Sequence, residues 1–358
     1  MGNCIRVKNS AQQNQVSKET SVVYKYIAKD PQIIYKTIVK TEKRLSDSLV
    51  DFLLNLEPVK NWANRELSHE IIPKDYDTLR IASWNLERLS TTKLSHPGYL
   101  EAIVSTILLS NADLVFLQEI KSPESLEIII NELNESQNNY IRTLTVFNNF
   151  KWDCIVSEEN VGKMFQGMEY AGVLYKNYSG IRVKKSAVFN EEVKSFSRAP
   201  FMVEVKVFDK TMLIMSVHLK APSMSTVESN LTKTKEEINT LGLLAKAAVG
   251  SFKNQDPCVI LIGDFNAASS NEAFDCIRES NFFPIFKEQK TSISALLNES
   301  RKGGEYDNCW LSDGLGKNYK NSSGVVYKSI QHPFIFNHDH GWNGFASDHA
   351  LIYLDLCK

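Results

Sequence analysis

From Leu79 onward the chain is built from short apolar segments that end in polar residues and alternate with segments of helical or loop character. Their near-continuous Ile, Val and Leu content is typical of strands buried on both faces, in sheets that helices cover. The predicted strands are LRIASWN (79–85), DLVFLQE (113–119), AGVLYK (171–176), FMVEVKVF (201–208), TMLIMSVHLK (211–220), CVILIGDFN (258–266), YDNCWLS (306–312) and ALIYLDL (350–356). Helices are predicted between them, at about 98–110, 124–138, 229–253 and 271–280. The fold class is therefore α/β.

The residues before this region have a different pattern. Residues 1–20 are polar and lack periodicity, which predicts a disordered tail. Asp30 as an N-cap and Pro31 at the first helical position then begin a long amphipathic helix, whose apolar residues recur at helical spacing until Pro58. We therefore expect a helical extension and connector over 21–77, followed by one large domain over 78–358.

Composition limits the classes of function. The chain carries 41 basic and 42 acidic residues, so it lacks the global positive charge that drives tight, non-specific binding to nucleic acid. An enzyme that must release its product needs no such charge. The six cysteines form no CxxC pair, which argues against a zinc site or a disulfide framework. No apolar run of roughly 18 residues and no secretory leader is present, so we expect an intracellular, cytoplasmic location without a transmembrane segment.

Polar side chains gather where the predicted strands end. Because polar groups at strand ends of a packed sheet converge on one rim, these residues are expected to form a site there. They are carboxylates, amides and imidazoles, namely Asn85, Glu87, Glu119, His218, Asp264, Asn266, Asp348 and His349.

The motifs that carry these residues follow one another in a familiar order: SWNLE (83–87), LQE (117–119), VHLK (217–220), GDFNA (263–267), YDN (306–308) and SDH (347–349). Together they resemble the endonuclease/exonuclease/phosphatase superfamily, over Leu79 to Leu356. The resemblance implies two packed mixed β-sheets flanked by helices in a four-layer sandwich, with 78–358 as the catalytic domain. It also implies a metal-dependent phosphodiesterase.

Phosphodiester hydrolysis requires stabilisation of charge on the phosphoryl oxygens, a water nucleophile and a stabilised leaving alkoxide. Mg²⁺ prefers hard oxygen ligands and suits this chemistry, with Mn²⁺ as a substitute. Glu119 is the first expected ligand and Asn85 supports it. Glu87 and Asp348 are further ligands if a second metal binds.

Two histidines match the imidazoles that contact the scissile phosphate and transfer protons in the superfamily, namely His218 and His349. Each needs a partner that fixes its tautomer. Asp307 in YDN matches the aspartate that orients the histidine of SDH, and Glu169 is expected to orient His218, as in the pancreatic-type deoxyribonucleases.

The GDFNA motif supplies the remaining expected catalytic groups. Asp264 is expected to position or deprotonate the attacking water or to protonate the leaving group, and Asn266 to donate to the transition-state oxyanion. The sequence does not decide whether Asp264 or His349 is the general base.

Two further residues bear on the substrate. SFSRAP (195–200) resembles a segment of the pancreatic-type deoxyribonucleases whose arginine meets a backbone phosphate, which assigns that role to Arg198. Tyr170 stands where abasic-site endonucleases of the superfamily place a phosphate-contacting tyrosine, and its alternative is a half-buried strand aromatic.

These features favour a nuclease that cleaves DNA in preference to RNA. A sphingomyelinase-type lipid phosphodiesterase and a catalytically inactive binding module of the same fold remain alternatives. Inositol-polyphosphate 5-phosphatases have an arginine directly after the aspartate that corresponds to Asp307, whereas this chain has Asn308, which argues against that class. The leucine-rich repeats typical of deadenylases are not found in this sequence, which argues against that class as well.

Two segments suggest additional properties. The N-terminal MGNC offers Gly2 for myristoylation and Cys4 for palmitoylation, although Arg6 stands where the signal prefers Ser or Thr. His338 and His340 are two residues apart and could share a metal ion on an extended loop, while a solvated loop bordering the catalytic cleft is the alternative.

Overall fold

The computed structural model describes residues 71–357 apart from several gaps. These gaps are 96, 140–149, 165–166, 179, 190–194, 208–209, 222–226, 253–255, 298–303, 328, 333–334 and 336–343. The predicted tail 1–20, the helix that begins at Asp30, the acylation residues Gly2 and Cys4, and the pair His338 and His340 all lie outside the described residues. The proposed division of the chain at residues 20 and 77 therefore stays a prediction.

The described strands form two mixed β-sheets. The first sheet contains, from edge to edge, β12 (Tyr319–Val326), β13 (Leu351–Cys357), β1 (Thr78–Leu89), β2 (Leu114–Ile120), β5 (Gly167–Asn177) and β3 (Lys151–Val156), with β4 (Gly162–Met164) paired to β5. The second contains β10 (Phe282–Pro284), β11 (Asp307–Ser312), β9 (Val259–Asp264), β8 (Lys210–His218), β7 (Phe201–Val207) and β6 (Ile181–Val188). Each sheet has a parallel pair, β1 with β2 and β8 with β9, among antiparallel neighbours.

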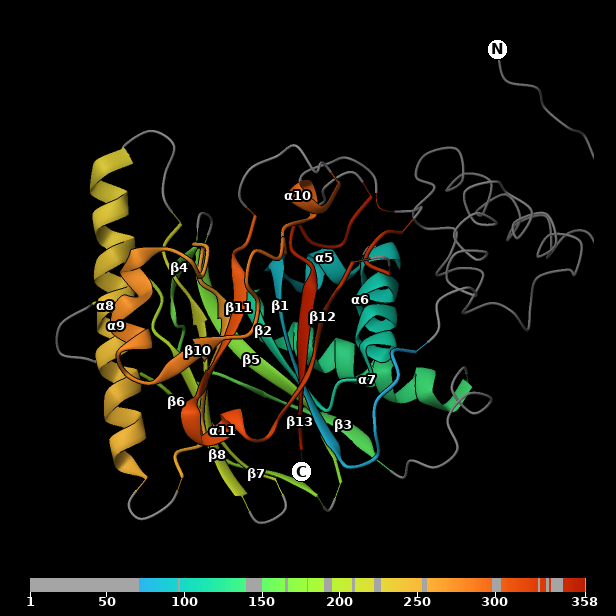
Figure 1. Ribbon diagram of the computed structural model, residues 1–358. Helices are drawn as coiled ribbons and strands as arrows, with labels where there is room; N and C mark the ends of the chain where they lie inside the picture. The colour runs from blue at the N-terminus through green and yellow to red at the C-terminus, as the bar shows by residue number, and fades with distance from the viewer. Residues whose placement is uncertain are drawn as a thin grey trace, which may run out of the picture.

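Helices cover the outer face of each sheet, so the order of layers is helix, sheet, sheet, helix (Figure 1). The first sheet is covered by α5 (Thr91–Ser95), α6 (Pro97–Ser110) and α7 (Glu124–Asn139). The second is covered by α8 (Val227–Ser251), η2 (Glu272–Phe274) and α9 (Asp275–Arg278). Two short helices, α10 (Ile293–Leu297) and α11 (Asp313–Gly316), complete the described elements. The predicted α/β sandwich is confirmed.

Three apolar clusters fill the spaces between the layers. Side chains alternate along a strand, so neighbouring residues of β1 belong to two different clusters. Ile81 packs between the sheets, whereas Ala82 and Trp84 pack beneath the helices of the first sheet. Burial on both faces explains why the central strands read as continuous apolar runs. None of the helices in the described part of the chain has both the length and the hydropathy needed to cross a membrane.

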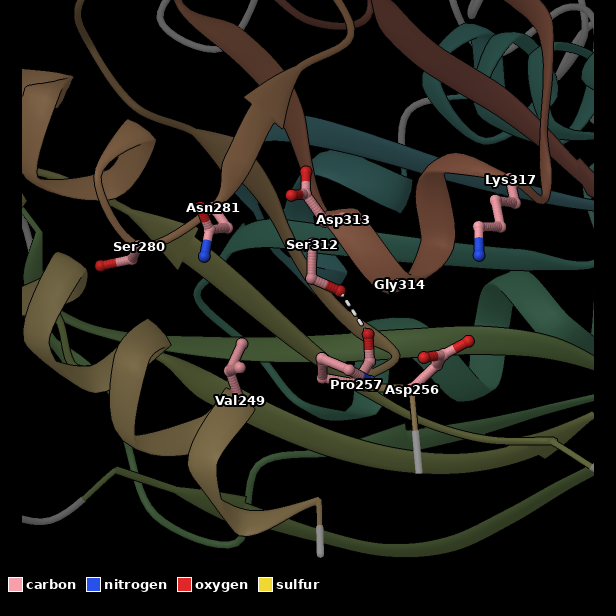
Figure 2. Close-up of a pocket in the computed structure, with 9 residues that line it drawn as sticks. All are labelled: Val249, Asp256, Pro257, Ser280, Asn281, Ser312, Asp313, Gly314 and Lys317. Atoms are coloured by element: carbon pink, nitrogen blue, oxygen red, sulfur yellow. Dashed lines mark hydrogen bonds between the residues drawn. The ribbon is translucent and has the colours of Figure 1, made fainter. Parts of the chain in front are cut away.

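A pocket of about 300 Å³ opens beside the second sheet, where β9 begins and β11 ends (Figure 2). Val249, Pro257, Ser312 and Lys317 are among its lining residues. The Ser312 hydroxyl donates to the carbonyl of Pro257 across 2.6 Å, so this pair of lining groups is bonded within the chain. The polar ends of the strands lie at the other end of β9, at Asp264.

Candidate active site

Strand register brings the predicted residues of the second sheet into one row. In the parallel pair β8 and β9, His218 lies opposite Asp264, and in the antiparallel pair β11 and β9, Asp307 also lies opposite Asp264. Gly263 permits the close approach of β8, because its φ is +138° and an added Cβ would collide with the carbonyl oxygen of Val217. The glycine of GDFN therefore fixes the position of the following aspartate.

Asp264 is the centre of the site. Its Oδ2 accepts a hydrogen bond from Nδ2 of Asn85 at 3.1 Å, which links β9 of the second sheet to β1 of the first. The same oxygen lies 3.7 Å from Nε2 of His218 and 3.6 Å from Nε2 of His349. Its Oδ1 accepts from the backbone N–H of Asn266 at 2.9 Å. Both imidazoles thus direct one nitrogen toward a single buried carboxylate.

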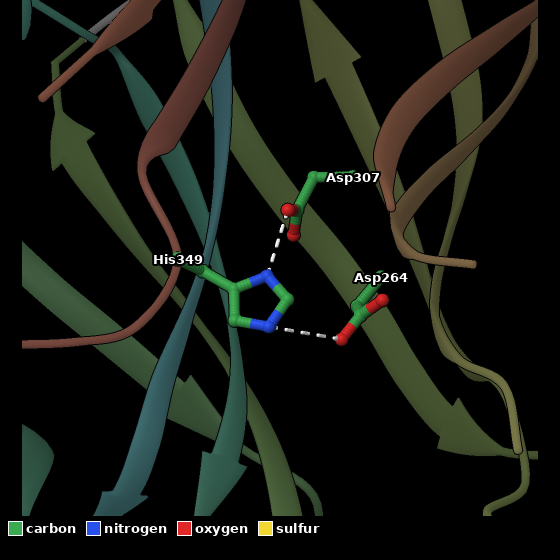
Figure 3. A group of neighbouring side chains, drawn as sticks. All are labelled: Asp264, Asp307 and His349. Atoms are coloured by element: carbon green, nitrogen blue, oxygen red, sulfur yellow. Dashed lines mark hydrogen bonds and ion pairs between the residues drawn. The ribbon is translucent and has the colours of Figure 1, made fainter. Parts of the chain in front are cut away.

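His349 is paired with Asp307 through its other nitrogen, with Nδ1 2.8 Å from Oδ2 (Figure 3). An ionised carboxylate only accepts, so Nδ1 carries a proton and donates it. Burial alone would lower the pKa of His349, but the charges of Asp307, Asp264 and Asp348 raise it well above the usual value. The surrounding carboxylates therefore favour the protonated form of this imidazole.

His218 is held by the first sheet in the same way. Its Nδ1 lies 2.7 Å from Oε1 of Glu169, which stands on β5 and is 1% exposed. Burial, the largest single effect, and the charge of Arg198 would lower the pKa of His218, but the charge and hydrogen bond of Glu169, together with the charge of Asp264, raise it above the usual value. The two predicted carboxylate–imidazole pairs are thus both present as hydrogen-bonded contacts.

Glu119 is the second-last residue of β2 and has a left-handed conformation, with a φ of 59°. Its Oε1 accepts from Nδ2 of Asn85 at 3.0 Å, and its Oε2 accepts from the backbone N–H of Arg88, also at 3.0 Å. Burial would raise the pKa of Glu119, but the charge of His218 and the hydrogen bond from Asn85 lower it. Glu119 is therefore an ionised carboxylate fixed by two donors.

Glu87 and Asp348 complete a group of carboxylates beside Glu119. One buried oxygen of Glu87, Oε2, accepts no hydrogen bond from the described residues. Burial, followed by the charge of Asp348, raises the pKa of Glu87 and outweighs the opposing charges of Lys93 and Arg88. An orphaned carboxylate oxygen among hard-oxygen donors fits a divalent cation such as Mg²⁺. Within this group, the amide of Asn85 positions the Glu119 carboxylate.

Asp264, Asp307 and His349 offer ligand atoms that all lie within 4.8 Å of one another, which is also close enough to share a cation. Both nitrogens of His349 already face carboxylates, however, and Nδ1 is engaged by Asp307. This trio therefore suits proton transfer better than metal binding, and we favour the Glu119 group as the metal site.

The other predicted residues have distinct surroundings. Arg198 is 9% exposed, and its Nε and Nη2 donate to the carbonyls of His218 and Leu219 at 3.1 and 2.9 Å. Nδ2 of Asn266 donates to the same Leu219 carbonyl at 2.9 Å. Tyr170 is half-buried and packs against the helix-covered core, away from the row that its neighbour Glu169 joins. The structure brings Arg198 and Asn266 to the site and does not bring Tyr170 into contact with it.

Two contributing residues were not predicted. The Ser347 hydroxyl donates to the carbonyl of Asn85 at 2.6 Å and accepts from the backbone N–H of His349, so it ties the SDH segment to β1. Its place in the SDH motif was an available signal. Lys93 donates to carbonyls next to Glu87, and a single lysine in a polar segment gives no such signal.

No family model matches the chain. The Xenopus laevis protein named "Endonuclease/exonuclease/phosphatase family domain-containing protein 1" is 28% identical over 284 residues, which are 78% of this chain and 49% of that protein. The chain thus spans about half the length of that curated relative. "Deoxyribonuclease-1-like 1" of Bos taurus is 25% identical over 195 residues, which are 53% of this chain and 54% of that protein.

Solved structures share the fold at low sequence identity. A humanized D. rerio TDP2 has a TM-score of 0.51 at 14% identity, covering 78% of this chain and 99% of that one. The mannosyl-6-phosphatase Bt3783 of Bacteroides thetaiotaomicron VPI-5482 has a TM-score of 0.51 at 15% identity, covering 78% and 99%. The resemblance inferred from the strand-end motifs is confirmed.

Proposed function

We propose that this chain, which has the DNase I-like fold of the endonuclease/exonuclease/phosphatase superfamily, is a Mg²⁺-dependent phosphodiesterase that cleaves DNA. One observation carries the proposal. Two imidazoles, each backed by its own carboxylate, direct Nε2 at Asp264, beside the carboxylate group of Glu119, Glu87 and Asp348. This arrangement supplies proton donors, a proton acceptor and hard ligands within one site.

The metal would be held by Glu119, Glu87 and Asp348, with Asn85 fixing the first of these. When bound, Mg²⁺ supplies Lewis-acid stabilisation of the charge that develops on the phosphoryl oxygens. The donor set contains no thiolate or imidazole, which favours Mg²⁺ or Mn²⁺ over softer ions. Which ion binds, and whether one or two bind, are parts of the proposal that metal titration tests.

Different side chains of the site would donate and accept protons during the reaction. The raised pKa of His349 favours its protonated form, so Nε2 is suited to donate to a phosphoryl or leaving oxygen. Asp264, buried between the two Nε2 atoms, is then suited to accept the proton of the attacking water. Asp307 and Glu169 keep the Nδ1 protons in place while these transfers occur.

DNA is the proposed substrate for two reasons. The match to a protein named as a deoxyribonuclease covers about half of this chain, and SFSRAP carries the arginine that such enzymes direct at a phosphate. Arg198 is already used in part to hold carbonyls at the end of β8. We therefore propose two roles for Arg198: it contacts a phosphate of the substrate, and it positions His218.

A substrate panel tests the proposal. Purified protein with Mg²⁺ would be assayed on supercoiled plasmid, single-stranded DNA, RNA, sphingomyelin, a phosphoinositide and a sugar phosphomonoester at matched protein concentration. We expect cleavage of DNA. Hydrolysis confined to sphingomyelin would replace the nuclease with the lipid phosphodiesterase, hydrolysis confined to the monoester would make the protein a phosphatase, and an inactive protein would be a binding module.

A further inference from the structure

Lys93 is a fully buried lysine that the mechanism above does not use. It lies on α5, directly after β1, and its side chain is 0% exposed. Its Nζ donates to the carbonyls of Leu86 and Glu87 at 2.9 and 2.7 Å and lies 5.1 Å from the ring centroid of Tyr99. A buried ammonium is costly unless its donors are satisfied. Here backbone carbonyls next to the carboxylate group satisfy them.

The backbone that Lys93 holds is an irregular part of β1. The pairing of β1 with β2 shifts register between Asn85 and Leu89, and within this bulge Glu87 and Arg88 have φ values of 43° and 56°. Left-handed conformations are unfavourable for non-glycine residues, and they persist only where the surroundings enforce them. The two hydrogen bonds from Lys93 stabilise this left-handed backbone.

The bulge also orients the carboxylates of the proposed metal site. It presents the Glu87 side chain, and its Arg88 N–H donates to Oε2 of Glu119 at 3.0 Å. The backbone N–H of Glu87 donates to Oδ1 of Asn85 at 2.9 Å. A shift of the bulge would therefore move one proposed ligand and remove a hydrogen bond from another.

We propose that Lys93 is a positioning residue that locks the β1 bulge so that Glu87 and Glu119 face one divalent cation, an inference that rests on the proposed function. Two effects of removing Lys93 oppose each other. Loss of a nearby positive charge would favour binding of a cation, whereas two unpaired carbonyls beside a strained backbone would let the ligands move. Because two of the three N–H donors of the ammonium hold bulge carbonyls, we expect the loss of geometry to dominate.

Binding of Mn²⁺ alone, measured by electron paramagnetic resonance without substrate, tests this inference. Lys93→Met should weaken Mn²⁺ binding by about tenfold or more, the usual scale for groups that orient metal ligands. Arg88→Gly should reduce that loss, since glycine accepts a left-handed φ without support. Lys93→Gln, which keeps N–H donors on a shorter side chain, should show an intermediate affinity and serves if the Met variant does not fold.

Lys176 provides a matched control. It is also a buried lysine, 6% exposed, and lies on β5 seven residues beyond Glu169, roughly 23 Å away at about 3.3 Å per residue. Lys176→Met should leave Mn²⁺ affinity unchanged. Unchanged or tighter Mn²⁺ binding by folded Lys93 variants, or equal weakening by Lys176→Met, would overturn the inference. If the wild-type protein binds no Mn²⁺, the proposed metal site fails as well.

Discussion

Nδ1 of His349 lies 2.8 Å from Oδ2 of Asp307, and its Nε2 lies 3.6 Å from Oδ2 of Asp264. One imidazole therefore connects two buried carboxylates that face each other across strands β9 and β11. Asp307 is placed to keep the ring protonated and oriented, while Asp264 shares with the ring the space in which a phosphate would react.

The pH dependence of the reaction should reveal this pairing. The charge of Asp307 is the largest effect that raises the pKa of His349. Removing it with Asp307→Asn should lower that pKa. If protonated His349 is the proton donor, activity is lost as pH rises through its pKa, so the alkaline limb of the pH–rate profile should move to lower pH in the variant.

The same profile distinguishes the two candidates for the general base. A shift of the acidic limb, instead of the alkaline one, would mean that neutral His349 accepts the proton. Asp307→Asn should also cost less rate than His349→Ala, because the ring itself remains. If neither limb moves, the Asp307 and His349 pair does not take part in the rate-limiting proton transfer.

The three groups around the reacting space should each be needed. Replacing His218, His349 or Asp264 with Ala should lower turnover by at least about 10²-fold, the usual scale for proton-transfer and oxyanion groups. Steady-state rates on plasmid DNA, with circular dichroism as the control for folding, measure this. A double His218→Ala, His349→Ala variant within a few-fold of the wild-type rate would be incompatible with the mechanism.

The central strands were predictable from sequence, and the edges were not. All eight predicted strands exist, while β3, β6, β10 and β12 were missed, and these four are the edge strands of the two sheets. An edge strand has one neighbour and more solvent, so it carries polar residues: after the buried Ile181, every position of β6 is half-buried or exposed, including Lys184 and Lys185. The short β4 was missed as well. A search for continuous apolar runs finds strands that are buried on both faces.

The site was predictable where the functional side chains lie at the ends of strands that the sequence also predicts. The row of His218, Asp264 and Asp307 follows from strand register once the strands are known. The burial of Arg198 behind two carbonyls does not follow from SFSRAP, because those carbonyls belong to His218 and Leu219, at and just after the end of β8. The hydrogen bonds from Lys93 to the β1 bulge were not predictable either, because the residue types do not reveal the backbone conformation of that bulge.

Arg198→Ala should lower cleavage of DNA more than hydrolysis of a small aryl phosphodiester. A neighbouring phosphate is present only in the polynucleotide, and the binding energy from that contact can be used at the reacting centre. Added salt should also depress DNA cleavage. Lys185→Ala, which removes an exposed cation on the edge strand β6, is the control and should leave both rates unchanged. Equal losses on both substrates would mean that Arg198 acts only by positioning His218.

Lys176 should make stability depend on pH. Burial lowers its pKa to about 7, and Lys74 shares the carboxylate of Asp113 with it. From pH 7 to the ordinary lysine pKa, the unfolded chain binds the extra proton, so the free energy of unfolding should rise with pH. Urea denaturation at pH 7 and pH 9 should show this rise in the wild-type protein relative to Lys176→Met. Parallel behaviour of the two proteins would contradict the lowered pKa.

The most direct test of the account is cleavage of supercoiled plasmid with Mg²⁺ by the wild-type protein, Glu119→Ala and the control Glu124→Ala. Glu119 lies in the proposed metal site and Glu124 is an exposed residue at the start of α7. We predict that the wild-type protein and the control cleave the plasmid, that EDTA abolishes cleavage, and that Glu119→Ala loses orders of magnitude in rate while remaining folded. Cleavage that persists in EDTA, or a folded Glu119→Ala variant as fast as the wild-type protein, would contradict the assignment of a metal-dependent site at the strand ends.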